Sequence, residues 1–182
     1  ILGILKEKAA AGLDVRLLYD DVGCLRLLPQ GYYETMEEFG IKCEAFNPFV
    51  PFVSVVMNNR DHRKILVIDG DVGFTGGINL ADEYINEKER FGYWKDTGIM
   101  LKGDAVWNLT VMFLHIWNAL RPTDASFGNF RPHTYRQKDY GSDGYVQPYG
   151  DSPLDFENVG ENVYLNIINT AKDYVYMFTP YL

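Results

Sequence analysis

The chain has 182 residues, 47% of them hydrophobic, which is enough to bury the core of one domain, or of one domain with part of a second. Its formal net charge of −8 argues against a protein that grips nucleic acid by its phosphates, and we expect no nucleic-acid partner. No uncharged apolar run reaches the roughly 18 residues that a membrane-spanning helix requires. Composition therefore predicts a soluble α/β chain.

The first quarter of the chain twice shows a helix followed by a strand. Residues 4–11 and 31–39 are rich in good helix formers, and a glycine ends each stretch. Residues 15–19 and 41–46, which come after these glycines, have the β-branched and apolar composition of strands. Two such units in succession predict a layered α/β sheet.

The next segment, residues 46–57, is aromatic and apolar but is interrupted by Pro48 and Pro51. Proline disfavours both a regular helix and a central strand, so we expect an ordered loop. Its aromatic side chains are costly to leave in water, and aromatic side chains suit a membrane interface. Contact with lipid and burial against the same domain remain two open interpretations of this loop.

A β-hairpin is predicted from residues 63–68 and 72–75, because Gly70 between them accepts the positive φ of a tight turn. Asn79 is a candidate cap for a helix over residues 80–88. A strand over residues 97–101 is expected next.

The remaining elements divide the chain into three parts. Asp104 is a candidate cap for a long helix that ends at Leu120, where the first compact region should end. Residues 121–156 are rich in Pro, Gly, Asp, Ser and Tyr, which predicts a linker. Residues 157–182 contain an amphipathic helix, 161–172, and a β-rich run, 174–178.

One short constellation carries the chemistry of the chain. Residues 62–69 have the form H-x-K-x4-D, and a Gly-Gly-Ile-Asn sequence begins after six intervening residues. A chance match to both patterns at this spacing has a probability on the order of 10⁻⁵. The residues of these patterns that we single out are His62, Lys64, Asp69, Gly76, Gly77 and Asn79.

The two patterns resemble the phospholipase D superfamily, and the wider sequence is similar to bacterial cardiolipin synthases. The likeness runs over about residues 1–120 and resumes at 160–182. The segments that carry it outside the motif are 15–23, 46–49, 59–61 and 73–75. The resemblance implies an αβα layered fold, a mixed sheet flanked by helices. Residues 1–120 would then form a first half that lacks its opening strand, and residues 157–182 would begin a second half.

Phosphodiester transfer needs a nucleophile, charge compensation for the non-bridging oxygens and a proton for the leaving alkoxide. The resemblance implies that His62 attacks phosphorus and forms a phosphohistidine, with no metal or cofactor. Side chains alternate along a strand, so His62 and Lys64 are expected on one face, close enough to share a phosphate. Lys64 and the Asn79 amide would bind the phosphoryl oxygens, together with helix-opening NH groups beside Gly76 and Gly77.

Two acidic residues complete the predicted site. Asp69 belongs to the motif, but it lies an odd number of residues from His62 and Lys64 and therefore on the other face of the strand. This position and its place in the hairpin favour a structural role in the turn. Asp96 is the candidate that holds the His62 ring in one tautomer, because the superfamily often carries such an acid at this point. The alternative for Asp96 is a surface cap or ion pair.

The resemblance implies a phosphatidyltransferase that joins two phosphatidylglycerol molecules and releases glycerol. Family members carry two copies of the motif, whereas this chain carries one, so we expect a half-site within a larger protein. The expected partners are phosphatidylglycerol or another anionic phospholipid, at the cytoplasmic side of a bacterial membrane. Two alternatives stay open: a phosphodiesterase or nuclease that pairs two His62 groups in a homodimer, and a non-catalytic module that binds anionic headgroups.

Overall fold

The computed structural model describes residues 1–24, 27–48, 59–90, 92–135, 141, 144–151 and 156–177. The chain forms two compact units, Ile1–Gln147 and Pro148–Leu182. The predicted domain boundaries at residues 120 and 156 stay predictions. Most of the predicted aromatic loop, residues 49–57, lies outside the described residues, so its contact with lipid remains open.

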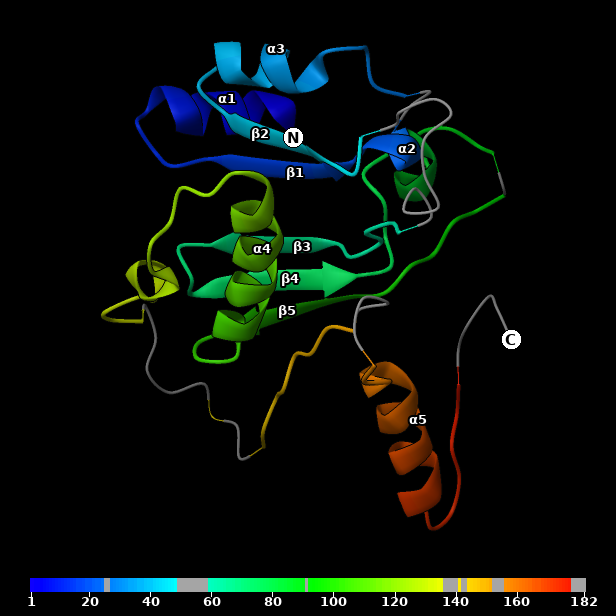
Figure 1. Cartoon of the computed structure of the whole chain (residues 1–182). Coiled ribbons are helices and arrows are strands. Elements are labelled where there is room, and N and C mark those ends of the chain that lie inside the picture. The colour runs from blue at the N-terminus through cyan, green and yellow to red at the C-terminus, as the bar shows by residue number, and fades with distance from the viewer. Residues whose placement is uncertain are drawn as a thin grey trace. The chain divides into compact units, whose positions relative to one another are not determined.

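The first unit begins with a parallel pair of strands covered by helices. Strand β1 (Arg16–Asp20) pairs with β2 (Lys42–Phe46), in register from Arg16↔Lys42 to Asp20↔Phe46. Helices α1 (Leu2–Ala10) and α3 (Tyr32–Glu38) lie over this pair, and the one-turn helix α2 (Asp21–Cys24) follows β1 (Figure 1). Side chains from α3 and β2 meet in a core whose buried members are Met36, Ile41 and Cys43. The predicted helix-then-strand units are therefore present.

An antiparallel sheet forms the rest of this unit. Its strands run in the order β3 (Ile65–Ile68), β4 (Val72–Gly76) and β5 (Gly98–Lys102). Helix α4 (Val106–Leu120) packs on one face, where a Cβ at Gly73 would come within 2.8 Å of Leu109. The chain is thus α/β, as predicted, with both parallel and antiparallel pairing, and hydrogen bonding divides its described strands into two sheets.

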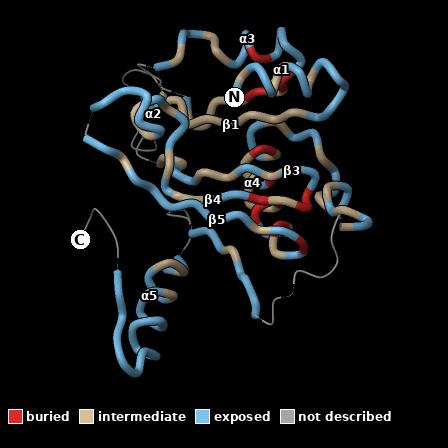
Figure 2. The backbone as a smooth tube through the Cα atoms, turned by 180° about the vertical axis from the view of Figure 1, so that it is seen from behind, coloured by how far each residue is buried: buried red, intermediate tan, exposed pale blue. Residues whose placement is uncertain are grey.

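The two faces of the antiparallel sheet differ in burial. The face toward α4 contacts the buried side chains of that helix, whereas the other face is open in the rear view (Figure 2). Leu66, Phe74 and Met100 form one cross-strand row on this open face and are 52%, 36% and 54% exposed. Alternation along each strand separates these residues from those that touch α4.

Two predicted helix signals are wrong. Asn79 caps no α-helix, because only a 3-10 turn, η2 (Asp82–Ile85), forms after Ala81. Asn86 stops this turn: it has a φ of 61°, and its side-chain amide exchanges two hydrogen bonds with the backbone of Trp94. The carboxylate of Asp104 accepts a hydrogen bond from the Tyr135 hydroxyl at 2.7 Å and does not cap α4.

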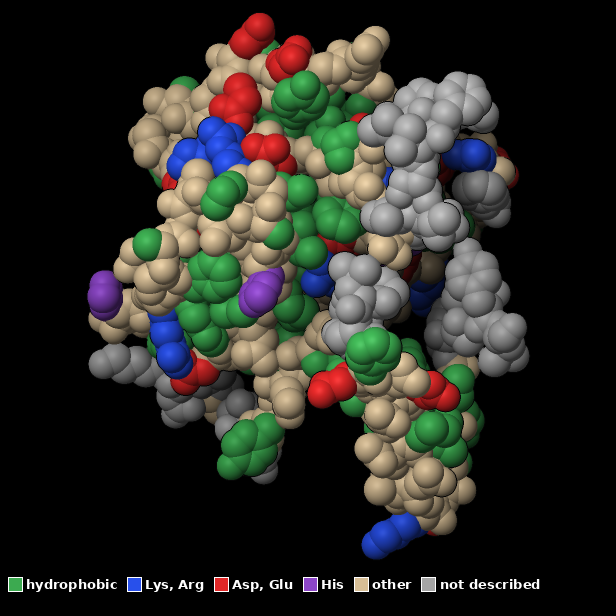
Figure 3. All heavy atoms as spheres, viewed as in Figure 1, with side chains coloured by type: hydrophobic (Ala, Val, Ile, Leu, Met, Phe, Trp, Pro, Cys, Tyr) green, Lys and Arg blue, Asp and Glu red, His purple; other side chains and the backbone are tan. Residues whose placement is uncertain are grey.

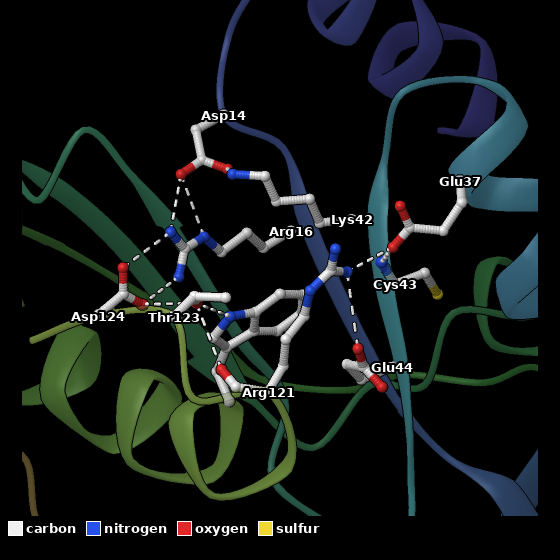
Figure 4. A network of polar contacts seen from close by, with 10 residues as sticks. Asp14, Arg16, Glu37, Lys42, Cys43, Glu44, Arg121, Thr123 and Asp124 are labelled. Carbon is white, nitrogen blue, oxygen red and sulfur yellow. Dashed lines mark hydrogen bonds and ion pairs between the residues drawn. The ribbon is translucent and has the colours of Figure 1, made fainter.

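A charged network ties the chain after α4 to the parallel strands (Figure 4). Arg16 at the start of β1 binds Asp124 at 2.6 Å and Asp14 at 2.9 Å. Its guanidinium also lies over the Trp117 ring and over the ring of Phe130, at 5.3 and 4.8 Å from their centroids. Phe130 belongs to a second 3-10 turn, η3 (Phe127–Phe130), within the predicted linker. The beginning of that segment is therefore packed and hydrogen-bonded.

The second unit contains helix α5 (Val159–Thr170), close to the predicted range. Residues 174–177 are not in a strand, so that prediction is wrong for these residues, while Phe178 lies outside the described residues. A strand needs a hydrogen-bonded partner, and the described residues of this unit include no other strand. Of the helices in the described ranges, none is long and apolar enough to cross a membrane.

Replacing Asp124 by Asn tests the charged network. The hydrogen bond from Arg16, more than any other influence, holds the pKa of Asp124 below its ordinary value. Because the folded-state pKa is depressed, the stabilisation is present above the unfolded pKa of about 4 and is lost as the pH falls through the folded value. Asp124→Asn should lower the free energy of unfolding by about 1.5–3 kcal/mol at pH 7. The difference from the parent should shrink at pH 3, as measured by urea denaturation.

The matched control is Asp82→Asn, which removes a carboxylate from the exposed pair with Lys88. This change should cost less than about 1 kcal/mol. Equal losses for the two variants at pH 7 would show that the Arg16 network adds nothing beyond an ordinary surface pair.

Candidate functional site

The histidine and lysine of the motif lie in extended chain immediately before β3. The strand begins at Ile65, two residues later than predicted, because side chains occupy the preceding backbone donors. The Asp61 NH donates to the Asp20 carboxylate, and the Arg63 NH donates to the carboxylate of Asp61. These bonds take the place of a strand ladder, so residues 59–64 follow a path set by side chains.

Two polar residues at the carboxyl ends of the parallel strands hold this segment. Asp20 is the last residue of β1, and Asn47 follows β2 with a φ of 44°. The Asn47 amide donates to the Asn59 carbonyl at 2.9 Å, and the Arg60 guanidinium donates to the Asn47 carbonyl at 2.9 Å. Neither residue is among the site residues predicted from the sequence. Their signal is a polar side chain directly after each of two parallel strands, where sheets commonly build sites.

His62 is exposed, and Lys64 is partly buried. The Lys64 ammonium donates to the backbone carbonyl of His62 at 2.5 Å, so the lysine side chain folds back beside the histidine. Among the described residues, none forms a hydrogen bond or ion pair with the His62 ring. The structure thus brings Lys64 to His62 through the main chain, and a phosphate shared by their side chains stays a prediction.

The antiparallel register gathers the other predicted residues at the same end of the sheet. Ile65 pairs with Thr75, so Lys64 precedes β3 at the end where Gly76 closes β4. Gly76 pairs with Gly98, which brings the residues before β5, including Asp96, to this end as well. Asn79 follows three residues after Gly76 and is exposed. Three segments distant in sequence therefore meet around the motif.

The two glycines make room for the chain before β5. A Cβ on Gly76 would lie 2.5 Å from the Thr97 carbonyl oxygen, and one on Gly77 would lie 2.6 Å from the Asp96 carboxylate. Because neither glycine has a side chain, the Thr97 backbone can lie close to Gly76 and the Asp96 carboxylate close to Gly77. The helix-opening NH groups expected beside these glycines are not there, because no α-helix follows.

Asp96 and Asp69 lie differently with respect to His62. The Asp96 carboxylate accepts from the Trp94 indole at 3.1 Å and from its neighbour's NH, that of Thr97, at 2.8 Å. Its predicted bond to His62 stays a prediction. Asp69 and Gly70 have φ values of 54° and 67° and form the tight turn predicted for the hairpin. Asp69 therefore lies at the far end of β3, about 16 Å along the strand from Lys64 at roughly 3.3 Å per residue.

A small open pocket of about 80 Å³ lies beside the motif segment, on the side of α4. Figure 3 shows this side of the unit, with apolar side chains gathered over and beside the helix. Asp61, Arg63 and Ile65 line the pocket, whereas the alternate residues His62 and Lys64 do not. Within the described ranges, no group of three or more His, Cys, Asp or Glu side chains is placed to hold a metal ion.

The sequence matches one known protein family. Residues 1–109 match the family model described as the phospholipase D-like domain of cardiolipin synthase, and this range contains all the predicted site residues. The chain belongs to this family. The phospholipase D-like domain therefore extends from α1 into α4, across both sheets.

Longer bacterial proteins are similar over the whole chain or nearly all of it. An uncharacterised protein of Streptococcus mutans is 52% identical over 182 residues, which are 100% of this chain and 39% of that protein. Cardiolipin synthase 2 of Staphylococcus epidermidis is 37% identical over 183 residues, 100% of this chain and 37% of its own length. The cardiolipin synthase of Halalkalibacterium halodurans is 36% identical over 185 residues, which cover 98% of this chain and 35% of that protein. The chain thus spans less than two fifths of these relatives.

The two glycines of the phospholipase D-like domain should respond differently to alanine. At Gly76 the new methyl group meets backbone atoms of Thr97 and Gly98, which cannot move without separating β4 from β5. At Gly77 it meets the end of the Asp96 side chain, which can rotate. Gly76→Ala should cost about 2–3 kcal/mol of unfolding free energy, and Gly77→Ala about 1 kcal/mol.

Thermal and urea denaturation of the two variants measure this difference. Gly144→Ala is the control, because a Cβ there meets no atom within 4 Å, and its stability should equal that of the parent. A larger loss for Gly77→Ala than for Gly76→Ala would contradict the packing at this end of the sheet.

Proposed function

We propose that this chain supplies one half-site of a phosphatidyltransferase of the cardiolipin synthase type. The observation that carries the proposal is the register that brings Lys64 and Gly76 to one end of the antiparallel sheet, with the Lys64 ammonium bound to the His62 carbonyl. Membership of the cardiolipin synthase family supports the reaction type. The names of the longer relatives support the substrate class.

In the proposed first step, a ring nitrogen of His62 attacks the phosphorus of phosphatidylglycerol. A P–N bond forms, the P–O bond to the glycerol headgroup breaks, and the departing glycerol oxygen takes up a proton. Lys64 supplies positive charge next to the attacked phosphate, and the Asn79 amide donates a hydrogen bond to a non-bridging oxygen. The exposure of His62 supports this role, because a nucleophile must reach a large lipid substrate.

In the second step, a hydroxyl group of another phosphatidylglycerol attacks the same phosphorus. The P–N bond breaks, His62 is restored, and the hydroxyl proton passes to the group that protonated glycerol. We place this proton carrier on a second motif, in line with the two copies that the family resemblance implies. A second copy of this chain in a homodimer is the alternative source of that motif.

The proposed substrates are phosphatidylglycerol or other anionic phospholipids, met at the surface of a bacterial membrane on its cytoplasmic side. The site opens at one end of the antiparallel sheet, where His62, Arg63, Gly77, Asn79 and Leu80 are exposed. Substrate would therefore bind at the end of the sheet and not in the pocket beside α4, which His62 and Lys64 do not line.

Trapping of the phosphohistidine tests the proposal. The chain is mixed with vesicles of radiolabelled phosphatidylglycerol and quenched in alkali, and the labelled residue is identified by mass spectrometry. Label is expected on His62, because a P–N bond survives alkali and breaks in acid. His62→Ala should abolish the adduct, and Asn79→Ala should lower its rate of formation about 100-fold, the usual cost of one lost donor.

His133→Gln is the matched control, since His133 is exposed and lies outside the motif. It should form the adduct at the rate of the parent. Label that persists on the chain at the parent level after His62→Ala would contradict the proposed nucleophile.

A further inference from the structure

The Asp20 carboxylate connects the end of β1 to the motif segment. Its side chain is 12% exposed, and both oxygens accept hydrogen bonds from different parts of the chain. We propose that Asp20 is a positioning residue, which fixes the direction in which His62 leaves the main chain. This inference rests on the proposed function, because it assigns Asp20 to the site of His62.

Three donors surround the Asp20 carboxylate. Its Oδ2 accepts from the backbone NH of Asp61 at 3.0 Å, immediately before His62. Its Oδ1 accepts from the Gly23 NH at 3.0 Å and from the Arg60 guanidinium at 3.4 Å. One carboxylate thus joins the end of β1, the turn of α2 and the residues that enter the motif.

Asp61 and Arg63 form a clamp that spans His62. The Asp61 carboxylate accepts from the Nε and NH2 groups of Arg63 at 2.9 and 2.6 Å, and also from the Arg63 backbone NH at 3.0 Å. Burial alone would raise the pKa of Asp61, but the hydrogen bonds and charge of Arg63 lower it below its ordinary value. The residues on both sides of His62 are therefore bound to each other.

These contacts leave His62 little backbone freedom. Asp20 fixes the amide of Asp61, the clamp fixes Arg63 against Asp61, and Lys64 binds the His62 carbonyl. The imidazole itself carries no such tie to a described residue, so its direction is set by the main chain on which it stands. Of these anchors Asp20 belongs to another strand, so Asp20, together with the contacts of Asn47 to Asn59 and Arg60, sets where the clamp lies.

The chemistry of Asp20 explains why asparagine is a poor substitute. The carboxylate offers two acceptor oxygens to three donors, whereas an asparagine amide offers one oxygen and presents its NH2 group to another donor. Asp20→Asn must therefore release either the Asp61 amide or the pair of Gly23 and Arg60.

The experiment compares Asp20→Asn with Asp14→Asn in the 182-residue chain. Asp14 lies just before the other end of β1 and binds Arg16 and Lys42, so its substitution removes the same charge and also breaks ion pairs. NMR measures hydrogen exchange of the Asp61 amide. Titration with sodium tungstate, a phosphate mimic, is followed on the ring signals of His62. Thermal denaturation records the stability of each variant.

For Asp20→Asn we expect at least tenfold faster exchange of the Asp61 amide and about tenfold weaker tungstate binding. Asp14→Asn should lower the melting temperature yet bind tungstate within twofold of the parent. Unchanged tungstate affinity in Asp20→Asn, with a parent that binds through His62, would overturn the positioning role and leave the proposed function intact. A parent whose His62 signals ignore tungstate would overturn the proposed function, and the role of Asp20 with it.

Discussion

The antiparallel register of β3 with β4 is the constraint on which the rest of the site depends. The three-residue connection of Asp69, Gly70 and Asp71 fixes this register, and it places the end of β4 beside the residues that precede β3. A shift by one residue would turn every side chain of β3 to the opposite face and would expose the apolar contacts with α4. Burial against α4 and the geometry of the motif are thus two consequences of one pairing.

The parallel strands supply what the antiparallel sheet lacks, which is a fixed path for the chain before β3. Asp20 and Asn47 lie where β1 and β2 end together. The Asn47 amide donates to the Asn59 carbonyl, and the Asp20 carboxylate accepts from the Asp61 NH, so both hold the segment that carries His62. Helix α4 contacts both β2 and β3, and Arg16 binds the chain that follows this helix. The motif is therefore positioned by two sheets, both of which contact helix α4.

The sequence predicts those features that local physics controls. Helix formers ending in glycine predict α1 and α3, and the Asp-Gly pair predicts the hairpin turn. The motif predicts His62, Lys64 and Asn79 as a group because its spacing is specific. Two failed predictions involve side chains that compete with the backbone for hydrogen bonds. The carboxylates of Asp20 and Asp61 accept from the backbone NH groups of Asp61 and Arg63, which precede β3. The Asn86 side chain binds the backbone of Trp94 and stops the helix expected after Asn79. Such competition depends on contacts between distant residues, which periodicity does not reveal.

The absence of a strand at residues 174–177 has a similar origin. Their composition is that of a strand, but a strand also needs a neighbouring strand with which its backbone forms hydrogen bonds. Composition does not reveal whether the fold provides such a neighbour. The Asp96 carboxylate likewise has a neighbour that the sequence analysis did not consider, the indole of Trp94. Local sequence indicates which groups are available, and the fold decides which of them meet.

A crystal structure of this chain with bound tungstate would test the central claim most directly. The heavy anion is expected at the end of β3–β5, with its oxygens within hydrogen-bond distance of the His62 ring, the Lys64 ammonium and the Asn79 amide. Tungstate bound elsewhere, or an ordered Asn79 whose side chain points away from both His62 and Lys64, would contradict a phosphoryl site at this end of the sheet.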